Sequence, residues 1–209
     1  MTVSGLRELK KERTRQTLSD TAVALFLERG FDAVSVAEIA AAAEVSKPTL
    51  FRYFPAKEDL ALHRFADHED EPARVVAAAR AAGTAPLVAL RDHVLAGLER
   101  RDPVTGLNDD PRVLAFLRLL YGTPALVARM AAYQARSEEA LATALGGTDP
   151  LAARLAAAQI VAVLRVLAHE NVRRVEAGER VEELFPAAVA ATREAFRSLA
   201  EGLPAELAR

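Results

Sequence analysis

The segment Val45–Leu60, VSKPTLFRYFPAKEDL, gathers the side chains of this sequence that could bind an anionic polymer. Within sixteen residues it holds three aromatic residues, three cations and two prolines, whereas the rest of the chain is mostly alanine, leucine, arginine and glutamate. On a helix, with about 100° between successive residues, Leu50 and Phe54 share one side and Phe51 lies at its margin. The other side of that helix carries Pro48, Thr49, Arg52 and Tyr53.

The outward side chains have the chemistry of DNA contacts. An arginine can donate two hydrogen bonds to a guanine edge, a threonine can bond a base or touch a thymine methyl group, and tyrosine and lysine can hold phosphates. The alternative is an ordinary helical hairpin with a solvated basic face, because runs of charge are usually exposed surface. The pattern alone leaves both interpretations open.

Two short helices are predicted at and just before this segment. Ser35–Glu38 has the pattern of a capping box, in which the serine hydroxyl accepts a hydrogen bond from a free backbone amide and the glutamate carboxylate accepts one from the amide of the serine. A short helix is therefore expected to begin there, and it is expected to end near Ala43. After a tight turn, Ser46 is expected to cap a helix over Lys47–Tyr53, and Pro55 to stop it. A longer helix over about residues 6–28 precedes both. Together they predict a helix-turn-helix, whose second helix lies in a DNA major groove.

The rest of the chain also reads as helix. Apolar residues recur at spacings of three and four, and runs with period two are missing, so we predict an all-α fold. A fourth helix starts at Lys57, and His68–Pro72 is expected to be a linker. Proline and glycine clusters then divide residues 73–209 into about five helices, of which the last two long ones are expected over Leu151–Ala177 and about Pro186–Glu201.

Composition narrows the class of protein. The 209 residues are 51% hydrophobic, which is enough for a folded core in one large domain or two small ones. No stretch approaches eighteen uninterrupted apolar residues and no secretion signal is evident, so we expect no membrane span and a cytoplasmic location. The absence of cysteine excludes disulfides and thiolate metal sites. The net charge is only −2, but all four lysines fall in the first quarter of the chain, so a local basic surface is possible.

From Arg13 to Leu60 the sequence resembles the TetR family of bacterial transcriptional regulators. The resemblance is carried by LFLERGFDAVSV at the end of the first helix and by EIAAAAEVSKPTLFRYFPAKEDL after it. It implies a helix-turn-helix DNA-binding domain over residues 1–60 and a helical ligand-binding and dimerisation domain over residues 61–209. The positions equivalent to the family's DNA contacts are Ser35, Ser46, Lys47, Pro48, Thr49, Phe51, Arg52, Tyr53 and Lys57.

Three positions in this segment lead to further expectations. Phe51 stands where the family commonly has tyrosine, so it cannot donate a hydrogen bond to a phosphate. Ala56 stands where a serine or asparagine often caps the fourth helix, so that cap must come from elsewhere. Lys57 lies at the positive end of that helix, where a cation is unfavourable, so we expect it to bind a DNA phosphate and its loss not to lower stability.

The resemblance fades beyond about Phe65, as is expected of the family's divergent ligand-binding part, so residues 73–209 are interpreted from their own pattern. The helix over Leu151–Ala177 is apolar nearly all round, so it should be buried on more than one side. The last helix combines a four-three apolar stripe with a face of small alanines, which suits close helix packing. TetR-like proteins are typically dimers through these two helices, and a homodimer would match a palindromic double-stranded operator.

A small-molecule effector site is expected among the middle helices. Arg165 is the most informative candidate, because a guanidinium inside an apolar stretch needs a partner or a route to water. We expect it to face an enclosed cavity, and a solvent-exposed arginine or an ion pair at a dimer interface is the alternative. The full candidate set is Phe65, His93, Phe116, Tyr121, Tyr133, Gln134, Arg165 and His169, although aromatic residues at helical spacing are more often plain core.

An enzyme is the competing class of function. His63, His68 and the acidic run Glu69–Glu71 could be imagined as a metal site, but a five-residue histidine spacing splits the faces of a helix. No nucleotide-binding, zinc-protease or serine-hydrolase motif occurs, so we expect no catalytic residue, cofactor or metal. The sequence thus predicts a ligand-released repressor. A ligand-dependent activator and a helical enzyme that binds a small molecule are the alternatives.

Overall fold

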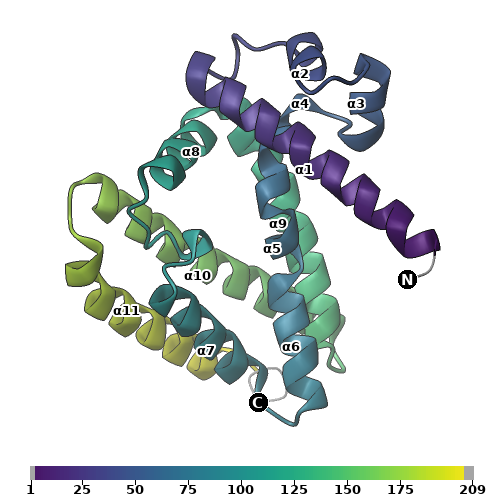
Figure 1. The fold of residues 1–209 in the computed structure, drawn as a ribbon. Coiled ribbons are helices and arrows are strands. Elements are labelled where there is room, and N and C mark those ends of the chain that lie inside the picture. Colours follow the sequence, from purple (N-terminus) through teal and green to yellow (C-terminus); the bar gives the residue numbers. More distant parts are fainter. Residues whose placement is uncertain (1–2, 205–209) are drawn as a thin grey trace. The chain divides into compact units, whose positions relative to one another are not determined.

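The computed structural model describes residues 3–204, and this part of the chain forms α-helices and two short 3-10 helices without any strand (Figure 1), which confirms the all-α class. The elements are α1 (Val3–Arg29), α2 (Val36–Ala42), α3 (Lys47–Tyr53), α4 (Lys57–Leu62), η1 (His63–Phe65), α5 (Ala66–Glu69), α6 (Glu71–Ala81), α7 (Pro86–Glu99), η2 (Pro103–Thr105), α8 (Pro111–Gly122), α9 (Pro124–Leu145), α10 (Pro150–Glu176) and α11 (Val181–Gly202).

Two of the predicted boundaries are wrong. The expected linker over His68–Pro72 is largely helical, because α5 runs to Glu69 and α6 begins at Glu71. Pro72 is tolerated there since it occupies the first turn of α6, where amides have no helical partner. The last helix begins at Val181 and includes Pro186, the predicted start. A proline within a helical pattern therefore does not always mark a helix boundary.

The chain folds into two compact units. The first comprises the described residues up to Asp67 together with Ala115–Ala131, and the second comprises His68–Leu114 and the described residues from Ala132 onward. Both α8 and α9 therefore have residues in each unit. The predicted domain boundary at residue 60 stays a prediction.

The core of the first unit is built on the apolar face of α1. Leu18, Ala22 and Phe26 are buried there, and the other helices of the unit add Ile39, Leu50, Phe54, Leu60, Leu120 and Leu126. Figure 1 shows α2, α3 and α4 gathered beside α1. The buried hydroxyl of Ser19 donates to the carbonyl oxygen of Leu60 at 2.8 Å, so a polar bond also fixes α1 against α4.

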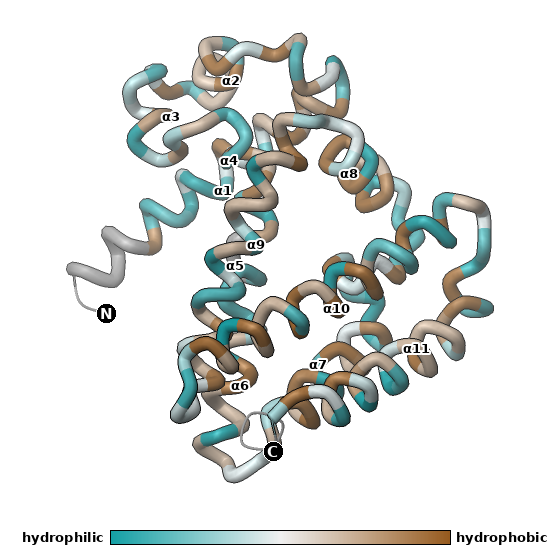
Figure 2. The backbone as a smooth tube through the Cα atoms, turned by 180° about the vertical axis from the view of Figure 1, so that it is seen from behind, coloured by the Kyte–Doolittle hydropathy of each residue, from teal (hydrophilic) through white to brown (hydrophobic). Residues whose placement is uncertain are grey.

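The second unit is a set of packed helices, in which α7 contacts both α6 and α11, and α10 contacts α11. Apolar residues run along these helices (Figure 2), and the buried ones form one cluster around Leu90 and Ile160 and another around Leu98 and Leu184. The short helix η2 lies close to both α7 and α10. A Cβ atom added at Gly97 of α7 would lie against Thr105 of η2. A Cβ atom added at Gly106, the residue after η2, would clash with the backbone of Ala168 of α10.

The helix α10 leaves part of its apolar surface uncovered. Leu151, Leu155 and Val166 are each more than half exposed. By its length and hydropathy, α10 could cross a membrane. It is the one helix in the described part of the chain that meets this criterion by itself, whereas α8 and α9 meet it only when they are joined. The search of the sequence for eighteen uninterrupted apolar residues does not identify α10, because Gln159 and Arg165 interrupt its apolar run. A helix that packs on a partner protein has the same composition.

Candidate nucleic-acid interface

The helix α3 begins and ends where the sequence predicts. Its cap, Ser46, accepts a hydrogen bond from the backbone amide of Thr49 at 3.2 Å, and Phe54 closes its C-terminal end. The Ser46 and Thr49 hydroxyl oxygens lie 2.8 Å apart, so one of these hydroxyls donates to the other. While this bond is kept, the pair retains one O–H for an external acceptor.

The helix α2 starts at the predicted capping box. The Ser35 oxygen accepts from the Glu38 amide at 3.2 Å, and the Glu38 carboxylate accepts from the Ser35 amide at 2.8 Å. Arg29, at the end of α1, donates to the same carboxylate at 2.7 Å. The bonds from Ser35 and then from Arg29 lower the pKa of Glu38 to about 2, so the cap is charged at neutral pH.

The turn between α2 and α3 is tight because its second residue is left-handed. Glu44 has φ of 55°, and the amide of Val45 donates back to the carbonyl of Ala40 at 2.9 Å. This backbone conformation is unfavourable for a residue with a side chain and is the usual position of a glycine. The backbone of Glu44 is therefore strained in the conformation that connects α2 to α3.

Replacing Glu44 with glycine should relieve that strain. We expect Glu44→Gly to stabilise the first unit by about 1 kcal/mol, because glycine adopts a positive φ without steric cost and the Glu44 side chain is exposed. Urea unfolding of the two proteins measures the change. Glu44→Ala, which keeps a Cβ atom, is the control and should give no comparable gain. A lower stability for the glycine variant would show that the turn is not strained.

The two sides of α3 differ as the helical pattern predicts. Leu50 and Phe54 are 0% and 4% exposed and lie in the core of the first unit. On the outward side, the Arg52 guanidinium lies 5.5 Å from the centre of the Tyr53 ring. At the margin, Phe51 is 41% exposed and the Lys47 ammonium lies 5.9 Å from its ring centre. The exposed residues on this helix are Lys47, Pro48, Phe51 and Arg52, while Thr49 and Tyr53 are half-buried.

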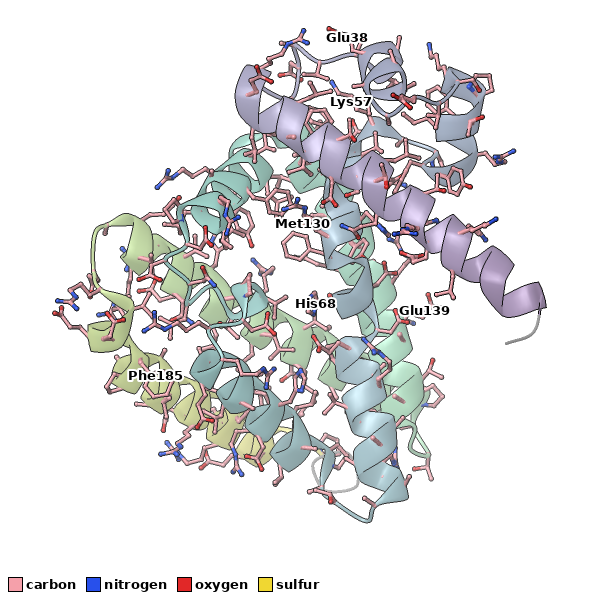
Figure 3. The ribbon with its side chains drawn as sticks, in the orientation of Figure 1. Glu38, Lys57, His68, Met130, Glu139 and Phe185 are labelled. Atoms are coloured by element: carbon pink, nitrogen blue, oxygen red, sulfur yellow. The ribbon has the colours of Figure 1, made fainter. Side chains whose placement is uncertain are left out.

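Lys57 does not extend freely from the first turn of α4. Its ammonium donates to the carbonyl oxygen of Phe31 and lies over the rings of Phe31 and Phe26. Figure 3 labels it among the side chains packed around α1 and α4. The expectation that loss of Lys57 does not lower stability stays a prediction, and these contacts with Phe31 and Phe26 weigh against it.

Asp59 replaces one half of the missing cap of α4, while its own amide donates to the backbone carbonyl of Ala56 at 3.2 Å. Its carboxylate accepts from the backbone amide of Ala56 at 3.1 Å, which is the reciprocal half of a capping box. Arg129 of α9 donates two further bonds to this carboxylate, at 2.7 and 3.0 Å. Sequence reasoning missed both residues. The spacing of Asp59 from the cap was a usable signal, but nothing in the sequence points to Arg129, seventy residues away.

The predicted ligand-binding residues are divided between the two units. Phe65 and Phe116 stack with ring centres 5.8 Å apart, and with Tyr121 they lie in the first unit. The others, His93, Tyr133, Gln134, Arg165 and His169, lie in the second unit. Arg165 and His169 are exposed, so the expectation that Arg165 faces an enclosed cavity is wrong. Whether any of the eight binds a ligand stays a prediction.

A carboxylate bridges two histidines in the second unit. The Glu71 oxygens lie 2.7 Å from His68 Nδ1 and 3.1 Å from His93 Nε2, and these bonds hold the pKa of Glu71 well below its usual range. In the sequence, His68 and Glu71 belong both to the expected linker and to the run that could be imagined as a metal site. Among the side chains that the structure describes, no group of three histidine, aspartate or glutamate residues could hold a metal ion.

Comparison with known proteins agrees with this geometry. Residues 18–63 match the family described as bacterial regulatory proteins, tetR family. Over 136 residues the chain is 39% identical to the HTH-type transcriptional regulator TcmR of Streptomyces glaucescens, an alignment that covers 65% of this chain and 58% of TcmR. The chain thus spans less than two thirds of this relative.

Two solved structures share the fold at lower identity. One is NalD, the secondary repressor of the MexAB-OprM multidrug efflux pump in Pseudomonas aeruginosa, with a TM-score of 0.58 at 20% identity over 88% of this chain and 97% of NalD. The other is the SmeT–triclosan complex, with a TM-score of 0.52 at 19% identity over 88% of this chain and 91% of SmeT. At these identities the likeness concerns the fold alone.

Proposed function

Since the chain belongs to the TetR family of bacterial transcriptional regulators, we propose that it is a repressor that binds a palindromic operator as a homodimer and is released by a small-molecule effector. In this proposal residues 1–60 bind DNA and residues 61–209 bind the effector and the second subunit. The proposed DNA contacts are the nine positions that the family resemblance implies.

The observation that carries the proposal is the exposed surface of α3. It presents a guanidinium, an ammonium and aromatic side chains on a helix that is capped at Ser46 and anchored at Leu50 and Phe54. Such a helix can enter a major groove without losing its hydrophobic core, and its arginine can read a guanine while its lysine holds a phosphate.

The proposed dimer rests on the uncovered apolar residues of α10. Leu151, Leu155 and Val166 would bury their side chains against a second copy of the chain, because monomers rarely leave an apolar surface of this kind in water. A two-fold dimer presents two α3 helices to two half-sites of opposite orientation, so the operator should be palindromic.

Release by an effector requires that the effector bind one conformation of the dimer more tightly than the other. The complex of the related fold SmeT with triclosan supports a small organic molecule as the class of effector. Repression rather than activation is proposed because it is the commoner mode in the family. A reporter gene placed behind the operator, with and without the protein, separates the two modes.

Selection of duplexes from a random library by the purified full-length protein tests the function. We expect enrichment of a sequence with two inverted half-sites, about one helical turn apart or a multiple of it, and binding by one or more dimers. Light scattering measures the oligomeric state of the protein in the absence of DNA. Binding without any sequence preference, or turnover of a small molecule independent of DNA, would contradict the proposal.

A further inference from the structure

We infer that Arg129 of α9 is a positioning residue of the proposed DNA-binding surface, which it holds in place through Asp59. The inference rests on the proposed function. It extends that function beyond residues 1–60, because Arg129 lies outside the segment that the family resemblance assigns to DNA binding, and also outside residues 18–63, which match the family.

The beginning of α9 is fixed on the core of the first unit. Leu126 is fully buried in this core, and Met130, which is labelled in Figure 3, packs against it. Because residues three positions apart are neighbours on the surface of a helix, Arg129 lies next to Leu126. The Arg129 side chain is 39% exposed, so its charge lies at the edge of the core.

The Asp59 carboxylate accepts three hydrogen bonds there. Arg129 donates two of them, from Nε at 2.7 Å and from a terminal nitrogen at 3.0 Å, and the backbone amide of Ala56 donates the third at 3.1 Å. The Asp59 side chain is only 20% exposed. A carboxylate that is largely withdrawn from water needs such partners, and a two-bond pair with arginine fixes both its distance and its plane.

The bond to Ala56 connects this ion pair with the proposed recognition helix. Ala56 lies in the segment that joins α3 to α4, directly before Lys57. Tyr53 and Lys57, two of the proposed DNA contacts, lie on either side of that segment. If the guanidinium is removed, the Asp59 carboxylate can turn toward water, and the segment loses the side-chain bond that fixes it. The phosphate contacts on both sides would then be less well placed.

The second unit contains a matched ion pair on the same helix. Arg136, two turns after Arg129, donates to Glu69 from Nε at 2.6 Å and from a terminal nitrogen at 3.1 Å. The Glu69 side chain is 19% exposed, close to the value for Asp59. Glu69 ends α5, and both members of this pair belong to the second unit. The Arg136 pair therefore has the same chemistry without the bond to the DNA-binding surface.

The test compares Arg129→Met with Arg136→Met in the full-length protein, at equal protein concentration. Each variant loses a two-bond pair with a mostly buried carboxylate, so the unfolding constant in urea should rise about tenfold in both. In the absence of urea, only Arg129→Met should weaken binding to mixed-sequence duplex DNA, by about threefold or more. Its slope of log K against log salt should remain that of the wild type, because none of the proposed phosphate contacts is removed.

A third variant keeps the charge at this position. Lysine can donate to the carboxylate but not from two nitrogens in one plane, so the DNA affinity of Arg129→Lys should lie between those of the wild type and Arg129→Met. Equal weakening of DNA binding by the two methionine variants would overturn the inference, because the effect would then be a general one on α9. A salt slope reduced by about one charge per subunit in Arg129→Met would also overturn it, since Arg129 would then bind a phosphate itself.

A double-mutant cycle on DNA affinity tests whether Arg129 acts through Asp59. Asp59→Asn keeps an oxygen that can accept from the Ala56 amide but removes the charge that binds the guanidinium. Arg129→Met should therefore weaken DNA binding less in the Asp59→Asn background than in the wild type. Full additivity would contradict the inference. If the wild type bound no duplex DNA, the proposed function would fail, whereas the same cycle measured by urea unfolding would still decide the contact of Arg129 with Asp59.

Discussion

Arg52→Ala should weaken binding to the selected operator by about 1–3 kcal/mol and relax the preference at one base pair of each half-site. The reason is that Arg52 lies on the outward side of α3, at the centre of the face opposite Leu50 and Phe54. A guanidinium at that place can donate two hydrogen bonds to a guanine edge, which alanine cannot replace. Competition binding with operators that differ at single positions measures both effects.

The variant should retain its fold and its weak binding to random sequence. Arg52 is exposed, and its one described contact within the protein is the ring of Tyr53 at 5.5 Å, so little stability is at stake. Lys47→Met is the matched comparison, because loss of a phosphate contact should weaken operator and random duplexes alike. Uniform weakening by Arg52→Ala as well would mean that Arg52 does not read a base.

Gly106→Ala should destabilise the second unit by about 3 kcal/mol or more. Gly106 has φ of +71°, and a Cβ atom there would lie 2.1 Å from the carbonyl oxygen of Ala168 and 2.9 Å from a methyl group of Val172. Because that oxygen belongs to the backbone of α10, the clash cannot be relieved by rotating a side chain. The loop would have to leave the helix and give up the 2.9 Å bond from Asn171 to the carbonyl of Thr105.

Gly83→Ala is a control with nearly the same backbone conformation. Gly83 has φ of +70°, and an added Cβ atom would meet nothing within 4 Å. It should therefore cost only the left-handed strain, about 1 kcal/mol. Urea unfolding with hydrogen exchange of the α7 and α10 amides would compare the two variants. Equal losses would show that the close approach of Gly106 to α10 is not what stabilises this loop.

The local structure of the candidate interface could be predicted from the sequence. The bounds of α3 and the caps at Ser35 and Ser46 follow from interactions between residues at most four positions apart, and helical spacing alone indicates that Leu50 and Phe54 share the buried side. A cap needs only a side-chain oxygen at the right place, and helical periodicity states which residues share a face. The all-α class follows from the same local signals repeated along the chain.

Which groups from different elements are in contact could not be predicted from the sequence. The tertiary structure gave Lys57 its partners at Phe31, joined Asp59 to Arg129, divided the predicted ligand residues between two units and exposed Arg165. A helical pattern predicts the direction in which a side chain points from the axis of its helix. The distance from that side chain to another helix depends on how the loops and the core position the two helices. For a charged side chain this distance decides whether a partner of its own chain is within reach.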